Sequence, residues 1–154
     1  MNTLAVPPAK TKAWLPVLIG GCAAGVFDLT AAFIEFGWSV PRAIASGLLG
    51  SAAFHGGTGA WILGVVLHFL IAFSAAAFYY IASRKLSFLK QHFLVCGVFY
   101  GIGVFLVMNL VVLPLSAVPW KVGPFALAAL IKGLLIHMFL IGLPISFSVG
   151  KFSE

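Results

Sequence analysis

The chain has 154 residues, of which 62% are hydrophobic and only 8% are charged. Soluble domains carry about 25% charged residues, and a water-soluble globule of this size could not cover its surface with so few. The composition argues against a soluble enzyme, a disordered segment and a disulfide scaffold, and it predicts a polytopic helical membrane protein with the lipid bilayer as its surroundings. The nine lysines and arginines lie mostly at the ends of apolar runs, so nucleic acid is not an expected partner.

Four apolar runs are each long enough to cross a bilayer core of about 30 Å, which takes roughly 20 helical residues. They cover residues 14–36, 60–83, 93–113 and 125–149. Helices are expected because every backbone amide must be paired within lipid, and the runs lack the alternation of a membrane barrel. The sequence thus predicts a single all-α membrane domain over residues 1–154 with four transmembrane helices.

The segments between the runs differ in character. Residues 37–59 contain Ser39, a plausible helix cap, and Pro41, which suits a first helical turn. About 14 mostly apolar residues follow, too few to span a bilayer, so we expect a short interfacial or re-entrant helix. Residues 84–92 form a short basic loop, and the prolines after residue 113 predict an extended connection.

The distribution of lysine and arginine predicts the orientation. Six of these residues lie at the termini and in the second loop, and only Arg42 and Lys121, with Lys132 nearby, lie on the other side. The six are Lys10, Lys12, Arg84, Lys85, Lys90 and Lys151. Since positive loops stay inside, both termini are expected in the cytoplasm.

Two patterns of small and apolar residues bear on packing. Gly21 with Gly25, and Gly97 with Gly101, predict close helix contacts, within one chain or between two copies. The two halves also share an order of short stretches: Gly25-Val26-Phe27, Val40-Pro41 and Gly64 to His68 in the first, Gly103-Val104-Phe105, Val118-Pro119 and Gly133 to His137 in the second. The pattern indicates either a parallel two-fold internal repeat or a chance similarity between apolar stretches.

Polar residues inside the apolar runs are the main functional signal, because a charge at the centre of a span costs about 2.5–3.5 kcal/mol. Each run carries one such residue at a depth of about 6–12 Å from the predicted outer end. These residues are Asp28, His68, Asn109 and Lys132. We expect Asp28 to pair with Lys132, and the other two to complete the hydrogen bonds. Glu35 and Arg42 would form a second polar layer above them.

This arrangement suits a site for a proton, an ion or a small polar solute. Asp28 would carry the charge or the proton, Lys132 would stabilise its charged form and His68 would relay protons. The structural alternative is an Asp–Lys pair that only neutralises two charges. A different alternative uses His68 and His137 as axial ligands of a haem b. Without haem no cofactor is expected, and no metal spacing or catalytic pattern occurs, so an enzyme is not expected.

Several stretches resemble a known group of proteins. They are Gly25-Val26-Phe27-Asp28, Ala43 to Gly50, Ala82-Ser83-Arg84, Met108-Asn109 and Pro114-Leu115-Ser116-Ala117. The chain resembles the YagU-like proteins, small bacterial inner-membrane proteins loosely tied to acid tolerance. The resemblance implies a multi-pass protein of the bacterial inner membrane, and it transfers no functional residue.

Together these features favour a small transport, channel or acid-stress membrane protein. An accessory or structural subunit of a larger membrane complex is the alternative, and a haem-binding electron carrier is a third candidate. Because four spans are few for a lone transporter, a homo-oligomer or a membrane-complex partner is expected.

Overall fold

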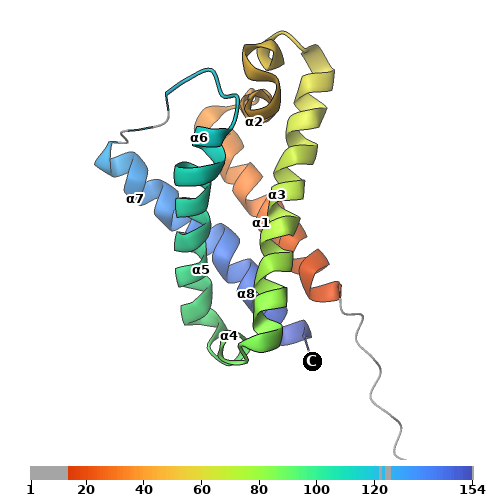
Figure 1. Cartoon of the computed structure of the whole chain (residues 1–154), viewed down its shortest axis with the longest axis vertical. Coiled ribbons are helices and arrows are strands. Elements are labelled where there is room, and N and C mark those ends of the chain that lie inside the picture. Colours follow the sequence, from red (N-terminus) through yellow and green to blue (C-terminus); the bar gives the residue numbers. More distant parts are fainter. Residues whose placement is uncertain (1–13, 122, 124–125, 154) are drawn as a thin grey trace, which may run out of the picture.

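The computed structural model describes residues 14–121, 123 and 126–153, and it contains helices and no strand within them (Figure 1). The α-helices are α1 (Leu15–Phe36), α2 (Val40–Leu49), α3 (Gly57–Lys85), α4 (Phe88–Gln91), α5 (Phe93–Val107), α6 (Leu113–Leu115), α7 (Leu127–Ile136) and α8 (Leu143–Phe152). A 3-10 turn covers Gly50–Phe54, and π-helical segments cover Met108–Val112 and His137–Gly142. The predicted all-α class is confirmed.

In the described part of the chain, four continuous helical stretches are long and apolar enough to cross a membrane. They are α1, α3, a third span from Phe93 to Leu115 and a fourth span from Leu127 to Phe152. The four predicted runs therefore match four helices, with ends that differ by a few residues. The predicted start of the fourth run, Phe125, lies outside the described residues.

The π-helical segments interrupt the third and fourth spans just before a proline. Pro114 follows the first segment and Pro144 follows the second, each by two residues. A proline donates no backbone hydrogen bond, and its ring clashes with the carbonyl four residues earlier. The wider π turn accommodates this clash, so both spans continue past their proline.

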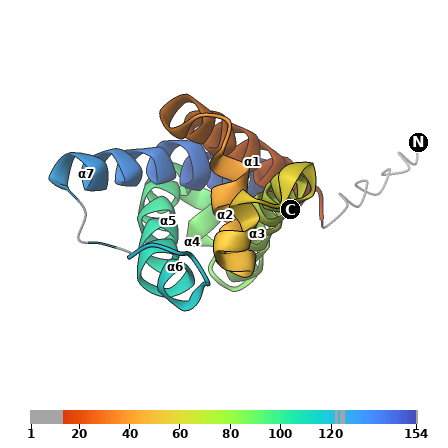
Figure 2. The same ribbon diagram turned by 90° about the horizontal axis from the view of Figure 1, so that it is seen from above.

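The segment between the first two spans forms the predicted short helix, α2. Pro41 lies in its first turn as expected, whereas Ser39 makes no side-chain capping hydrogen bond. Helix α2 packs against α3, where Gly64 lets the Pro41 backbone come close because glycine has no side chain. Seen from above, α2 lies over one end of the bundle (Figure 2), which we call the α2 end.

The opposite end of the bundle carries the ends of α1 and α8 and the short helix α4. The Ser148 hydroxyl donates to the Pro16 carbonyl over 2.8 Å and joins the first and fourth spans there. We call this end the basic end because Arg84, Lys85, Lys90 and Lys151 lie in or beside the segments that form it. Its location in the cytoplasm stays a prediction, and Lys10 and Lys12 lie outside the described residues.

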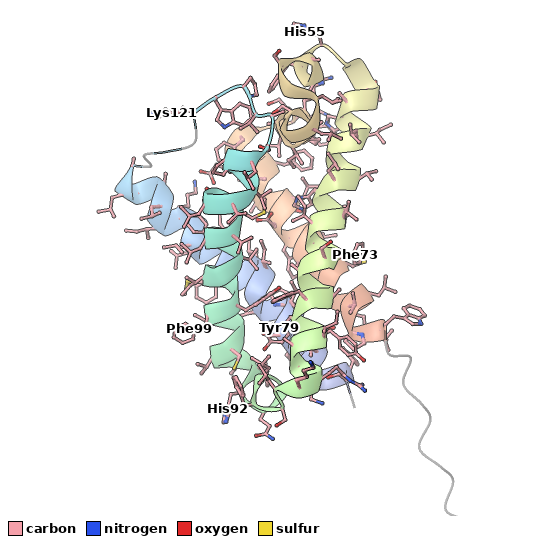
Figure 3. The ribbon with its side chains drawn as sticks, viewed as in Figure 1. His55, Phe73, Tyr79, His92, Phe99 and Lys121 are labelled. Carbon is pink, nitrogen blue, oxygen red and sulfur yellow. The ribbon has the colours of Figure 1, made fainter. Side chains whose placement is uncertain are left out.

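The fourth span crosses between α1 and α5 and completes the core. The buried cluster comprises Ala24, Ala76, Tyr79, Ile141, Ile145 and Val149, and Tyr79 lies between α3 and α5 (Figure 3). Gly20 of α1 faces Ile145 and Ser148, while Gly97 and Gly101 of α5 lie against the backbone of the fourth span. The Gly97–Gly101 pair therefore packs helices within one chain.

We expect Gly142→Ala to lower the free energy of unfolding by about 1–3 kcal/mol, the range for overpacking a tight core. A Cβ at this position would collide with the Gly97 carbonyl oxygen and the Gly101 backbone. Unfolding in detergent, followed by circular dichroism, measures the loss. Gly103→Ala is the control, since a Cβ there meets open space. Equal stability of the two variants would contradict the packing described.

Candidate polar site in the membrane bundle

The ion pair of the site joins Lys132 to Glu35, and Asp28 is not part of it. The Lys132 Nζ lies 2.8 Å from the Glu35 Oε1. The Lys132 side chain is 58% exposed and the Glu35 side chain 23% exposed. Both residues lie towards the α2 end. The structure thus pairs Lys132 with a residue of the expected outer layer in place of Asp28.

Asp28 lies over the seam between α3 and the fourth span. It follows Ala24 and Gly25 by about one helical turn. Ala24 belongs to the core with the fourth span, and Gly25 faces Phe69 and Ala72 of α3. Asp28 is half-buried, and no hydrogen bond or ion pair involves its carboxylate within the described residues.

His68 joins α3 to α1 close to Asp28. Its Nε2 lies 2.9 Å from the Gly25 carbonyl oxygen. Because a carbonyl only accepts, Nε2 carries the proton in this arrangement. Gly25 is three residues before Asp28, so His68 comes within one turn of the carboxylate along α1. Of the expected polar partners, His68 is the one tied to α1 at this level.

Asn109 and His137 are each satisfied by their own helix. The Asn109 Nδ2 donates to the Phe105 carbonyl over 2.9 Å, and the His137 Nδ1 lies 2.9 Å from the Gly133 carbonyl. Both residues are half-buried and lie in π-helical segments. Two contacts set the register of α1 against the antiparallel fourth span: Gly20 lies against Ile145, and Glu35 reaches Lys132. In this register Asp28 is about level with His137.

Arg42 belongs to a different group at the α2 end. Its Nε donates to the Gly57 carbonyl over 3.4 Å. Beside it, Trp38 and Trp61 stack with ring centroids 5.2 Å apart, and the Trp61 Nε1 donates to the Trp38 carbonyl over 3.0 Å. The expected Glu35–Arg42 layer is therefore divided. Counting depth along the sequence could not show that Glu35 would be the partner of Lys132.

The two histidines of the haem alternative have different surroundings. His68 uses Nε2 for its backbone contact, whereas His137 uses Nδ1 and packs edge-on against Phe105, with ring centroids 5.2 Å apart. Haem ligation by these two histidines stays a prediction. The internal repeat, which would make the histidines equivalent, stays a prediction.

Comparison with protein-family models, curated proteins and solved structures finds no match for this chain. The resemblance to the YagU-like proteins accordingly stays a prediction.

Replacing His68 by leucine removes the hydrogen bond between α3 and α1. We expect a loss of about 0.6 kcal/mol and at most about 1.7 kcal/mol, the range measured for such bonds between membrane helices. Unfolding in detergent measures it. Ser74→Ala is the matched control on α3, because that hydroxyl bonds only to Leu70 of its own helix. If both variants unfold alike, the His68 contact does not stabilise the bundle.

Proposed function

We propose that this chain is a small transport or channel protein that takes a proton or a small cation at Asp28. The observation that supports the proposal is the carboxylate of Asp28, half-buried in a membrane helix and without a partner within the described residues. We further propose that it resides in a bacterial inner membrane with both termini in the cytoplasm, and that it serves acid tolerance. These finer points come from the resemblance and from the charge distribution.

The energetic argument concerns the charged form of Asp28. A carboxylate in the middle of a membrane helix is costly unless a cation, a proton or water compensates it. Lys132, the partner that the sequence predicts for Asp28, forms its ion pair with Glu35 at 2.8 Å. The Asp28 carboxylate is therefore free to bind and release a proton or a cation, which is the property that a proton or cation carrier needs.

The placement of the neighbouring groups suggests a direction of entry. Glu35 lies seven residues after Asp28 on α1, two turns or about 10 Å nearer the α2 end. Lys132 is exposed there and the Glu35 side chain partly so, and a cation passing Glu35 would next meet Asp28. His68, within one turn of Asp28, would hand on a proton through its imidazole.

Asp28→Asn tests the proposal because it keeps the shape of the side chain and removes its charge. In liposomes that hold a pH-sensitive dye or a cation-sensitive dye, we expect an imposed potential to drive proton or cation flux through the native chain. The asparagine variant should fall to the rate of protein-free liposomes. Thr30→Val is the control, since the Thr30 hydroxyl bonds to Val26 of its own helix. Native flux in the asparagine variant would refute the role of Asp28.

A second candidate, assembly with another membrane chain, is favoured by helix α7. This helix diverges from the bundle (Figures 1 and 2) and has no buried residue. Leu127, Ile131 and Leu135 follow one another at intervals of four residues and are all exposed, so they form an apolar stripe along one face. Such a stripe suits an accessory subunit or a homo-oligomer, and here we propose contact with a second copy.

Cysteine cross-linking tests this assembly. In a background with Cys22→Ser and Cys96→Ser, an Ile131→Cys variant should form a disulfide-linked dimer in membranes after mild oxidation. Ile62→Cys is the control on α3 and has a similar exposure. A monomer at both positions would refute contact through α7, and equal cross-linking at both would indicate random collision.

A further inference from the structure

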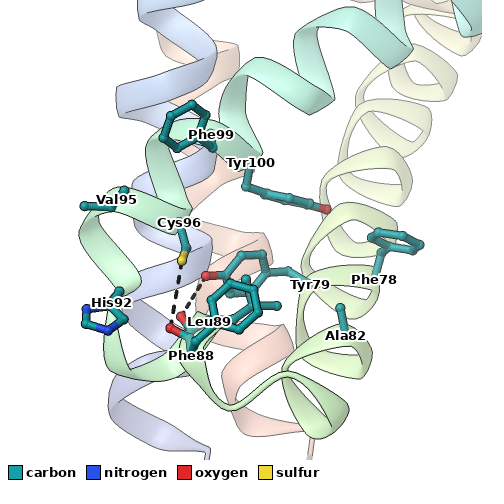
Figure 4. Close-up of a pocket in the computed structure, with 10 residues that line it drawn as sticks. All are labelled: Phe78, Tyr79, Ala82, Phe88, Leu89, His92, Val95, Cys96, Phe99 and Tyr100. Carbon is teal, nitrogen blue, oxygen red and sulfur yellow. Dashed lines mark hydrogen bonds between the residues drawn. The ribbon is translucent and has the colours of Figure 1, made fainter.

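An apolar groove lies between α3 and α5 at the basic end, with α4 across its lower end (Figure 4). Its volume of about 770 Å³ is within the range of small-molecule sites. Phe78 and Ala82 line it from α3, and Val95 and Phe99 line it from α5. No residue of the polar site around Asp28 lines this groove.

Two tyrosines separate the helices and shape the groove. The rings of Tyr79 and Tyr100 meet edge to face with centroids 4.8 Å apart. The Tyr79 hydroxyl donates to the Leu89 carbonyl over 2.9 Å, and the Tyr100 hydroxyl donates to the Ala75 carbonyl over 2.7 Å. With both hydroxyls engaged, Tyr100 offers mainly its ring to the groove, and Tyr79 is buried behind it. The wall therefore suits a hydrocarbon chain rather than a polar solute.

The groove is open towards the side of the bundle. Phe78 and Phe99 on its two walls are 68% and 69% exposed. Both belong to helices that are long and apolar enough to cross the membrane. An occupant can therefore enter from the lipid without passing through water, which favours a molecule of the bilayer itself.

The charge around the groove favours an occupant that carries a negative group. His92 lines the groove and is exposed, and Lys85 lies one turn after Ala82 on the same face of α3. The three acidic residues of the chain are Asp28, Glu35 and Glu154. Consequently α3, α4 and α5 carry no carboxylate, and nothing on them offsets Lys85 and the neighbouring Lys90.

We propose that the groove binds one anionic phospholipid, with an acyl chain between α3 and α5 and the phosphate at Lys85 and His92. Basic pockets between membrane helices recognise anionic headgroups in this way, and each nearby cation adds binding energy. A bare phosphate would leave the apolar walls unfilled. A zwitterionic lipid would fill the groove but gain nothing from Lys85.

Native mass spectrometry tests the proposal on the full chain. The protein is released from nanodiscs that hold equal amounts of phosphatidylglycerol and phosphatidylcholine with identical acyl chains. We expect one phosphatidylglycerol to be retained on the monomer in preference to phosphatidylcholine. Lys85→Gln should weaken the retention about fivefold, the effect of one surface charge. Lys151→Gln is the control and should not change it, because Lys151 lies at the same end but on α8, which contributes no residue to the groove lining.

A second pair of variants tests the groove separately from the charge. Val95 and Leu94 are both 60% exposed on α5, but only Val95 lines the groove. Val95→Trp should displace the lipid, whereas Leu94→Trp should not. Equal retention of the two lipids, equal effects of the two tryptophans, or a second copy of the chain in place of lipid would each overturn the proposal. The Asp28 flux measurement is independent of all these results.

Discussion

Close contact between helix backbones at glycines sets the register on which the rest of the bundle depends. Lipid gives helices no hydrophobic reason to associate, so packing and interhelical hydrogen bonds must do so. Gly20 brings α1 against α8, and Gly97 and Gly142 bring α5 against the fourth span. Once these contacts are made, Lys132 comes level with Glu35. The choice of partners in the ion pair is thus a consequence of backbone packing about four turns away on α1 and about three turns away on the fourth span.

Much of the fold could be predicted from the sequence because the signals are local. The length of an apolar run fixes whether it crosses the membrane, and Pro41 with the following apolar residues indicates a short helix. The ends were harder to predict, because a proline normally closes a helix. Pro114 was expected to end the third span, but the chain widens into a π turn and continues to Leu115.

The site was predictable only in part. Counting residues assigns similar depths to Asp28, His68, Asn109 and Lys132, yet Lys132 is level with Glu35 and not with Asp28. Counting also cannot give the rotation of each helix about its axis. Asn109 bonds to Phe105 of its own helix. His68 reaches the Gly25 carbonyl, at a position where the missing side chain lets Phe69 and Ala72 of α3 lie close to α1. Partner choice depends on contacts between residues far apart in sequence, which no single stretch encodes.

The distribution of charge separates the two proposed sites. Within the described residues both carboxylates, Asp28 and Glu35, belong to α1, and they lie on the half of that helix nearer the α2 end. The basic end has cations alone among those residues. A cation is therefore attracted towards α1 and an anion towards the groove, where each cation at the membrane surface adds about 1 kcal/mol. Lys85 lies about 25 Å along α3 from His68, which is close to Asp28, so the two sites are well separated. Each site can thus use its own electrostatic field with little interference from the other.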